Sequence, residues 1–150
     1  MLKVGDKAPE ISVHTDTGED FLLSALQGKR VVLYFYPKAD TPGCTVEACE
    51  FRDGVKALAR KGAAIVGVSP DKPAAQAKFK QKYELPFTLL ADEQKAAAEA
   101  YGVWKEKTMY GRKTMGIERT TFVISPDGKI EKIYGKVKAK GHAAEVLAEL

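Results

Sequence analysis

The chain has 150 residues, of which 45% are hydrophobic and 29% charged, and its formal net charge at pH 7 is +4. These values are ordinary for a globular protein and exclude a collagen, a disordered chain and a cysteine-rich knottin. The longest apolar run, 31–36, is too short to cross a bilayer and the N-terminus shows no apolar signal-peptide core, so we expect a cytoplasmic protein with no membrane contact.

The first two thirds of the chain predict a hairpin followed by alternating strands and helices. Residues 11–14 and 20–23 flank a short polar turn, which is typical of a hairpin. Residues 30–36 form a continuous β-branched and aromatic run, which indicates a strand buried on both faces. Beyond a turn rich in Pro and Gly, the pattern predicts a helix to Lys61, a strand at 63–69, a helix at 73–83, a strand at 87–90, and a helix at 94–101 that ends at Gly102.

The last third predicts a second hairpin and a final helix. Residues 119–124 and 129–134 are strands joined by the short turn 125–128, and the helix covers 142–150. This order predicts a three-layer α/β sandwich of thioredoxin-like fold, with a central mixed sheet and an N-terminal β-hairpin. No repeat, low-complexity tract or linker divides the sequence, so residues 1–150 are expected to form a single domain.

The most informative residue is Cys44, which follows a predicted buried strand and a turn and falls in the first turn of a helix. Unpaired backbone N–H groups and the positive end of the helix dipole favour its thiolate, the reactive form of a cysteine. The hydroxyl of Thr41 either caps this helix or hydrogen-bonds a ligand beside the sulfur. From these residues alone, an inert buried cysteine behind an ordinary helix cap is an equally good interpretation.

The pattern Pro37-x3-Thr41-x2-Cys44 resembles that of the peroxiredoxins, thiol peroxidases with a thioredoxin-like fold. The longer segment 34–49 is similar to the branch called bacterioferritin comigratory protein, or peroxiredoxin Q. The resemblance covers nearly the whole chain, because further similar segments follow in the expected order at 5–9, 67–71, 87–92, 101–104 and 119–122.

The resemblance implies a role for each of five residues. Cys44 matches the peroxidatic cysteine, which attacks the peroxide O–O bond and becomes a sulfenic acid. Cys49 matches the resolving cysteine, which forms an intramolecular disulfide with it. Thr41 matches the residue that orients the peroxide, and Pro37 the residue that shields the sulfur. Arg119 matches the distant arginine that supports the thiolate and the peroxide oxygen. Hydrogen-bond donors directed at the departing oxygen are what a displacement at the O–O bond requires.

The resemblance also implies the reaction partners. Hydrogen peroxide and organic hydroperoxides are the expected substrates, thioredoxin or a glutaredoxin-like protein the expected reductant, and no cofactor is needed. Glu47 lies one turn beyond Cys44 on the same helical face, where it either orients Arg119 or is a solvated helix carboxylate. The chain has no C-terminal cysteine arm, so we expect a monomer that dimerises weakly at most.

Four other interpretations compete with a peroxidase. A general thiol–disulfide oxidoreductase usually carries Cys-x2-Cys, whereas four residues separate the two cysteines here. A metal site from the cysteines with His14 and His142 lacks any ligand spacing, so no metal is expected. A non-enzymatic holdase or partner-binding module has no specific feature in its favour. The basic stretch 129–140 has no aromatic residues placed for base stacking, so no nucleic-acid partner is expected.

Helix geometry adds an expectation that is independent of the family. In one regular helix, Cys44 and Cys49 have Cα atoms roughly 8.7 Å apart and on different faces. A disulfide needs Cα atoms within about 7 Å. The bond therefore requires the start of the helix to unwind.

Overall fold

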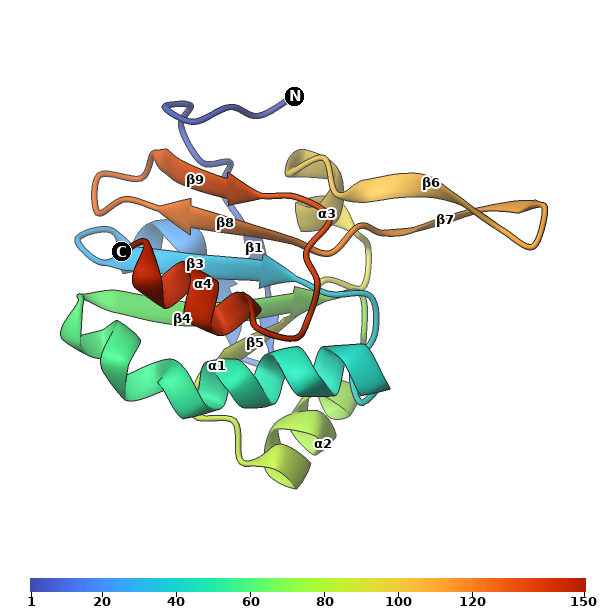
Figure 1. Cartoon of the computed structure of the whole chain (residues 1–150), viewed down its shortest axis with the longest axis horizontal. Helices are drawn as coiled ribbons and strands as arrows, with labels where there is room; N and C mark the ends of the chain where they lie inside the picture. Colours follow the sequence, from blue (N-terminus) through green and yellow to red (C-terminus); the bar gives the residue numbers. More distant parts are fainter.

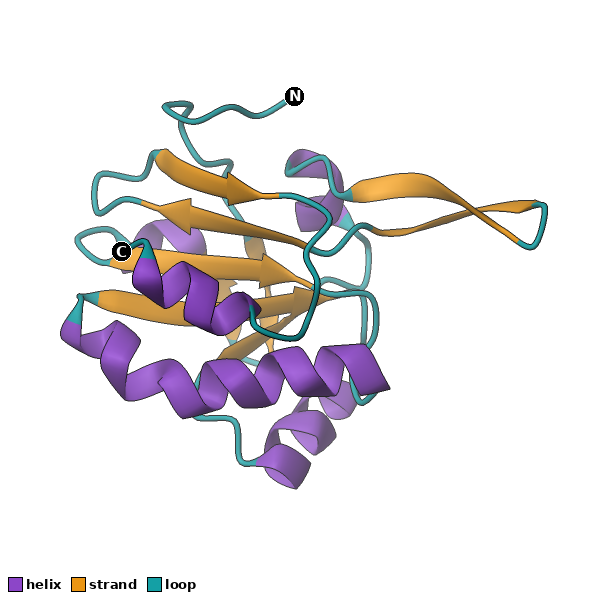
Figure 2. Ribbon diagram, viewed as in Figure 1, coloured by secondary structure: helices purple, strands orange, loops and turns teal.

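A computed structural model describes residues 1–150, with the side chain of Met109 left aside, and shows a mixed seven-stranded sheet between helices (Figures 1 and 2). The strand order is β2-β1-β5-β4-β3-β8-β9, in which β3, β4 and β5 are parallel and the other pairs antiparallel. The predicted N-terminal hairpin and mixed sheet are confirmed. The strands are β1 (Ser12–Thr15), β2 (Asp20–Leu22), β3 (Arg30–Phe35), β4 (Ala63–Ser69), β5 (Thr88–Ala91), β8 (Thr120–Ile124) and β9 (Ile130–Tyr134).

The central strand β3 is buried on both faces, as its apolar run predicts. Because side chains alternate along a strand, Val32 and Tyr34 pack in one core while Leu33 and Phe35 pack in the other. The first core lies under α1 (Pro42–Arg60), α2 (Pro73–Tyr83) and α4 (His142–Ala148), which cover the front face in Figure 1. The second lies under α3 (Ala96–Ala100), the 3-10 turn η1 (Leu23–Leu26) and the N-terminal segment.

Helix α1 begins weakly and ends in a well-packed half. Pro42 occupies its first turn, where a missing N–H costs nothing, but no acidic residue lies there and Thr41 at the N-cap makes no side-chain cap hydrogen bond. Further along, Phe51 and Leu58 are fully buried against the sheet. Packing in the second half therefore holds the helix in place.

One hairpin was not predicted from the sequence. Strands β6 (Trp104–Met109) and β7 (Arg112–Ile117) form a separate two-stranded sheet that projects away from the main body (Figure 1). At its base, Trp104 packs partly against the core, with the ammonium of Lys95 5.2 Å from its ring centre. The chain leaves β7 and reaches β8 through Glu118 and Arg119, so the strand predicted at 119–124 begins one residue later, at Thr120. None of the helices in the described residues is long and apolar enough to cross a membrane.

Candidate active site

The site centres on the thiol of Cys44, which the fold places at the carboxyl end of β3. Cys44 is the third residue of α1 and is only 1% exposed. Because β8 runs antiparallel to β3 and pairs Thr120 with Phe35, the residue before Thr120 reaches the same edge of the sheet. That residue is Arg119, whose Nη2 donates a hydrogen bond to the Cys44 Sγ at 3.3 Å. The structure thus brings together two residues that lie 75 positions apart.

A buried carboxylate completes this contact. The Nη1 of Arg119 donates to Oε1 of Glu47 at 2.6 Å, and Glu47 is 0% exposed, so it is not a solvated helix carboxylate. Its Oε2 has no hydrogen-bond partner among the described residues. Burial raises the pKa of Glu47 to about 7, and the charge and hydrogen bond of Arg119 oppose this only in part. One guanidinium therefore joins a buried sulfur and a buried carboxylate.

Thr41 lies at the N-cap of α1, but its hydroxyl does not cap the helix. The Oγ1 donates to the carbonyl of Lys38 at 2.8 Å. Its donor is therefore occupied, while its lone pairs remain available to accept a hydrogen bond. Pro37 lies half-buried in the loop between β3 and α1.

The loop before α1 is fixed by Asp71, a residue to which no sequence pattern assigned a role. Its Oδ2 accepts hydrogen bonds from the backbone N–H of Ala39 at 2.7 Å and from Ser69 Oγ at 2.6 Å. The available signal was its position just after β4, because neighbouring parallel strands end at the same edge of the sheet. Asp71 thus positions the loop that presents Thr41 and Cys44.

Gly43 makes room for the guanidinium. A Cβ on Gly43 would lie 3.3 Å from the Nη2 of Arg119, which is tighter than an ordinary van der Waals contact. In the sequence, this glycine is marked only as a turn former. Its second role follows from the approach of a residue that is distant in the chain.

Cys49 lies in the same helix as Cys44, and both are free thiols. Cys49 is half-buried, whereas Cys44 is buried. Since α1 is helical without interruption from Pro42 to Arg60, the sulfurs are held on different faces in this reduced form. This state is the one expected before oxidation.

The histidines occupy other places. His14 lies on β1 and contacts Asp20 at 3.1 Å on the surface. His142 is buried at the start of α4, where its ring nitrogens contact Thr121 Oγ1 at 2.7 Å and Glu145 Oε1 at 3.0 Å. Within the described residues, no three His, Cys, Asp or Glu side chains are grouped to hold a metal ion.

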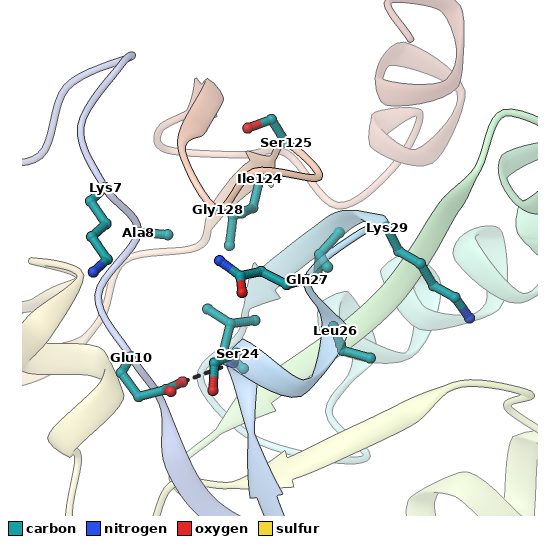
Figure 3. A pocket seen from close by; sticks show the side chains of 12 residues that line it. Lys7, Ala8, Glu10, Ser24, Leu26, Gln27, Lys29, Ile124, Ser125 and Gly128 are labelled. Atoms are coloured by element: carbon teal, nitrogen blue, oxygen red, sulfur yellow. Dashed lines mark hydrogen bonds between the residues drawn. The ribbon is translucent and has the colours of Figure 1, made fainter.

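A cavity of about 280 Å³ lies at the opposite end of the sheet (Figure 3). Its floor includes Val31, at the start of β3, and Ile124, at the end of β8, whereas Cys44 follows the end of β3. At its rim, Glu10 accepts a hydrogen bond from the backbone N–H of Ser24 at 3.0 Å. This cavity is therefore separate from the cysteine site.

Comparison with known proteins gives one family and relatives of one kind. Residues 4–133 match the model of the AhpC/TSA family. The chain is 51% identical to a putative peroxiredoxin bcp of Coxiella burnetii over 99% of both chains, and 50% identical to peroxiredoxin Bcp of Bacillus subtilis over 99% of this chain and 95% of that one.

Solved structures agree with the sequence matches. PrxQ of Xylella fastidiosa superposes with a TM-score of 0.94 at 34% identity, covering 99% of this chain and 95% of that chain. The bacterioferritin comigratory protein of Xanthomonas campestris gives 0.89 at 40% identity, covering 93% and 88%. These likenesses confirm the predicted thioredoxin-like fold.

Proposed function

This chain belongs to the AhpC/TSA family and is a peroxiredoxin of the Bcp group, a thiol-dependent peroxidase, and we propose that Cys44 is its peroxidatic and Cys49 its resolving cysteine. The observation that carries the proposal is the hydrogen bond from Arg119 to the Cys44 sulfur. A guanidinium has no acceptor and always carries charge, so this contact favours a thiolate over a thiol.

In the first step, the Cys44 thiolate attacks the terminal oxygen of a hydroperoxide. The S–O bond forms as the O–O bond breaks, Cys44 is oxidised to a sulfenic acid, and the peroxide leaves as an alkoxide or hydroxide that takes a proton from water. Negative charge moves from sulfur to the departing oxygen during this step. In this proposal the Arg119 guanidinium beside the sulfur and the backbone N–H of Cys44, in the first turn of α1, stabilise that charge, and Thr41 accepts a hydrogen bond from the peroxide.

In the second step, the thiolate of Cys49 attacks the sulfenic sulfur. The S–S bond forms, the S–O bond breaks, and the leaving hydroxide becomes water with the proton released by the Cys49 thiol. A thioredoxin dithiol, or that of a glutaredoxin-like protein, then reduces the disulfide by exchange and is itself oxidised. Because both cysteines are in one chain, a monomer is sufficient for the cycle.

The substrate class includes alkyl hydroperoxides as well as hydrogen peroxide. The Xanthomonas campestris relative is described for alkyl peroxide reduction. The reaction needs only the two peroxide oxygens at the sulfur, and Pro37 on the loop before α1 limits access of water to it. The cytoplasm, where a dithiol reductant is maintained, is the compartment that suits this cycle.

The test is mass spectrometry of the reduced protein after one equivalent of hydrogen peroxide. We expect a loss of two hydrogens and a peptide that joins Cys44 to Cys49, whereas Cys49→Ser stops at the sulfenic acid.

Hydrogen exchange on the reduced and the oxidised protein tests whether the start of α1 unwinds when the disulfide forms. Three or four helical hydrogen bonds, at about 1 kcal/mol net each, correspond to exchange about 10² to 10³ times faster around 44–49 in the oxidised form. Equal protection in both forms, with the disulfide confirmed, would contradict the unwinding.

A further inference from the structure

Unwinding of α1 must end somewhere, and the contacts of the three residues after Cys49 show where. Glu50, Phe51 and Arg52 each hold the helix to a different element. In the part of the chain that the structure describes, the polar side-chain contacts of the preceding residues of α1 are those of Cys44 and Glu47 with Arg119. The need for unwinding rests on the proposed function, in which Cys44 and Cys49 form a disulfide.

Glu50 ties α1 to the start of α4. Its Oε1 accepts a hydrogen bond from the backbone N–H of Gly141 at 2.8 Å, immediately before the first residue of α4. Gly141 has a φ of +85°, a conformation that residues other than glycine rarely adopt, and in this conformation its N–H donates to Glu50. Helix α4 is also held at its other end, where the Lys61 ammonium donates to the carbonyls of Leu147 and Leu150 at 3.0 and 2.7 Å. Side-chain hydrogen bonds therefore connect the two helices at both ends of α4, and only the one made by Glu50 is adjacent to a cysteine.

Phe51 and Arg52 extend the attachment to the core and to α2. The Phe51 ring is fully buried, with its centre 4.7 Å from that of Tyr34 and 5.9 Å from that of His142. The Arg52 Nη1 donates to the carbonyl of Tyr83, the last residue of α2, at 2.9 Å. Exposing Phe51 would add about 1.5–3 kcal/mol for its buried ring to the cost of the helical hydrogen bonds already broken, so unwinding past Cys49 is disfavoured and these residues stay in place.

The same residues suit the start of a shortened helix. The first turn of the intact α1 has no acidic residue and no side-chain cap. After Cys49, by contrast, Glu50 and Asp53 place two carboxylates in what becomes the first turn if 42–48 unwinds. Acidic groups there interact favourably with the helix dipole. A helix that begins at Glu50 is therefore better stabilised at its N-terminus than the intact helix that begins at Pro42.

We infer that Glu50 is a positioning residue for disulfide formation, because with Phe51 and Arg52 it stops the unwinding at Cys49. Cys49 then remains at the end of a fixed helix as a stationary nucleophile, and only the segment carrying the Cys44 sulfenic acid moves. A fixed partner raises the effective concentration of the attacking thiolate. The balance between disulfide formation and further oxidation of Cys44 to sulfinic acid depends on that rate.

The test compares three variants by rapid quench and mass spectrometry after a peroxide pulse. Glu50→Ala removes the acceptor for Gly141, Glu50→Gln keeps an oxygen acceptor, and Lys61→Met cuts the other join between α1 and α4. We expect disulfide formation about three- to tenfold slower in Glu50→Ala, with a matching rise in sulfinic acid. Glu50→Gln should restore most of the rate, and Lys61→Met should resolve at the parent rate despite a comparable loss of stability.

Hydrogen exchange on the oxidised variants gives a readout that stability alone does not move. In the oxidised parent, amides from 54 onward should stay protected, since their carbonyl partners lie at residue 50 and beyond; in oxidised Glu50→Ala, protection at 54–57 should fall. Faster disulfide formation in Glu50→Ala would overturn the inference, because Glu50 would then only stabilise the intact helix. So would an unchanged rate and boundary. If the parent itself forms no disulfide between Cys44 and Cys49, the proposed function fails instead.

Discussion

The two halves of α1 are stabilised by contacts of different kinds. In the first half, Cys44 and Glu47 are buried polar groups that share one guanidinium. In the second half, Phe51 and Leu58 make apolar contacts. Oxidation or protonation changes the first set of contacts and leaves the second unaffected. The stability of the first half is therefore coupled to the chemical state of Cys44, while the second half preserves the fold.

The largest effect should come from the apolar half. Phe51→Ala removes a fully buried ring from the core and should lower the free energy of unfolding by about 3–5 kcal/mol. Val46, in the first half, is 42% exposed, and Val46→Ala should change it by no more than about 0.5 kcal/mol. Urea denaturation of both variants measures the difference. Similar losses in the two would remove the distinction between the halves.

The next effect concerns the guanidinium. Arg119→Met removes the donor to the Cys44 sulfur and should slow peroxide reduction by about 10²- to 10³-fold, as measured by stopped flow. It also leaves Glu47 buried without its partner, so the variant should be less stable as well. Arg30→Met is the matched control, because Arg30 pairs with Glu131 near the other end of β3. A parent-like rate in Arg119→Met would show that Arg119 has no part in the chemistry.

The dependence of stability on pH tests the buried carboxylate. Because the pKa of Glu47 rises from 4.5 in the unfolded chain to about 7 in the fold, the folded state binds more protons between these values. Its contribution to stability is complete below pH 4.5 and is lost as the pH rises through about 7. Between about pH 5 and 8, the parent should therefore lose up to about 3 kcal/mol more than Glu47→Gln does. Parallel pH profiles from urea titrations would contradict this.

The smallest effect should come from Thr41. Its hydroxyl donates to the carbonyl of Lys38 and does not cap the helix, so its loss should change the rate more than the stability. Thr41→Val should reduce peroxide about tenfold more slowly, whereas Thr41→Ser should stay close to the parent. Steady-state assays at subsaturating peroxide compare the two. Equal rates would reduce Thr41 to a structural residue of the loop.

Local signals predicted the regular elements well where they were strong. Helix α2 spans 73–83 as expected, because Pro73 opens it and Glu84 adopts a left-handed conformation at its end. Helix α3 ends before Gly102, whose φ is +70°, but it begins at Ala96 and not at 94 as predicted, because Lys95 adopts a left-handed conformation with a φ of +60°. The β6–β7 hairpin escaped prediction because its residues are largely polar and exposed, so no apolar alternation marks the strands. Its turn, Tyr110-Gly111, has positive φ at both residues, as a type I′ hairpin turn requires, but Tyr is not the Asn, Asp or Gly that usually marks the first position of such a turn in a sequence.

The residues of the candidate site also differ in whether a local sequence signal marks them. Cys44 and Thr41 share one short segment, so their spacing could be interpreted directly. Arg119 required the resemblance to a family, because nothing local marks an arginine that reaches a sulfur 75 positions away. The partner of Glu50 lies 91 positions along the chain, and the carboxylate looks like any solvated helix residue until α4 is placed beside it. Long-range pairing is set by the topology of the sheet, which no single segment encodes.

The projecting hairpin has an optical consequence. Trp104 is the only tryptophan of the chain, it pairs with Ile117 across the hairpin, and Ile117 lies two residues before Arg119. The indole ring also faces the ammonium of Lys95, a group that quenches or shifts emission when its distance changes. Trp104 is thus a single intrinsic fluorophore at the base of the hairpin, two residues from Arg119 through its partner Ile117, and a change of its emission on addition of peroxide would report a movement of that base without a label.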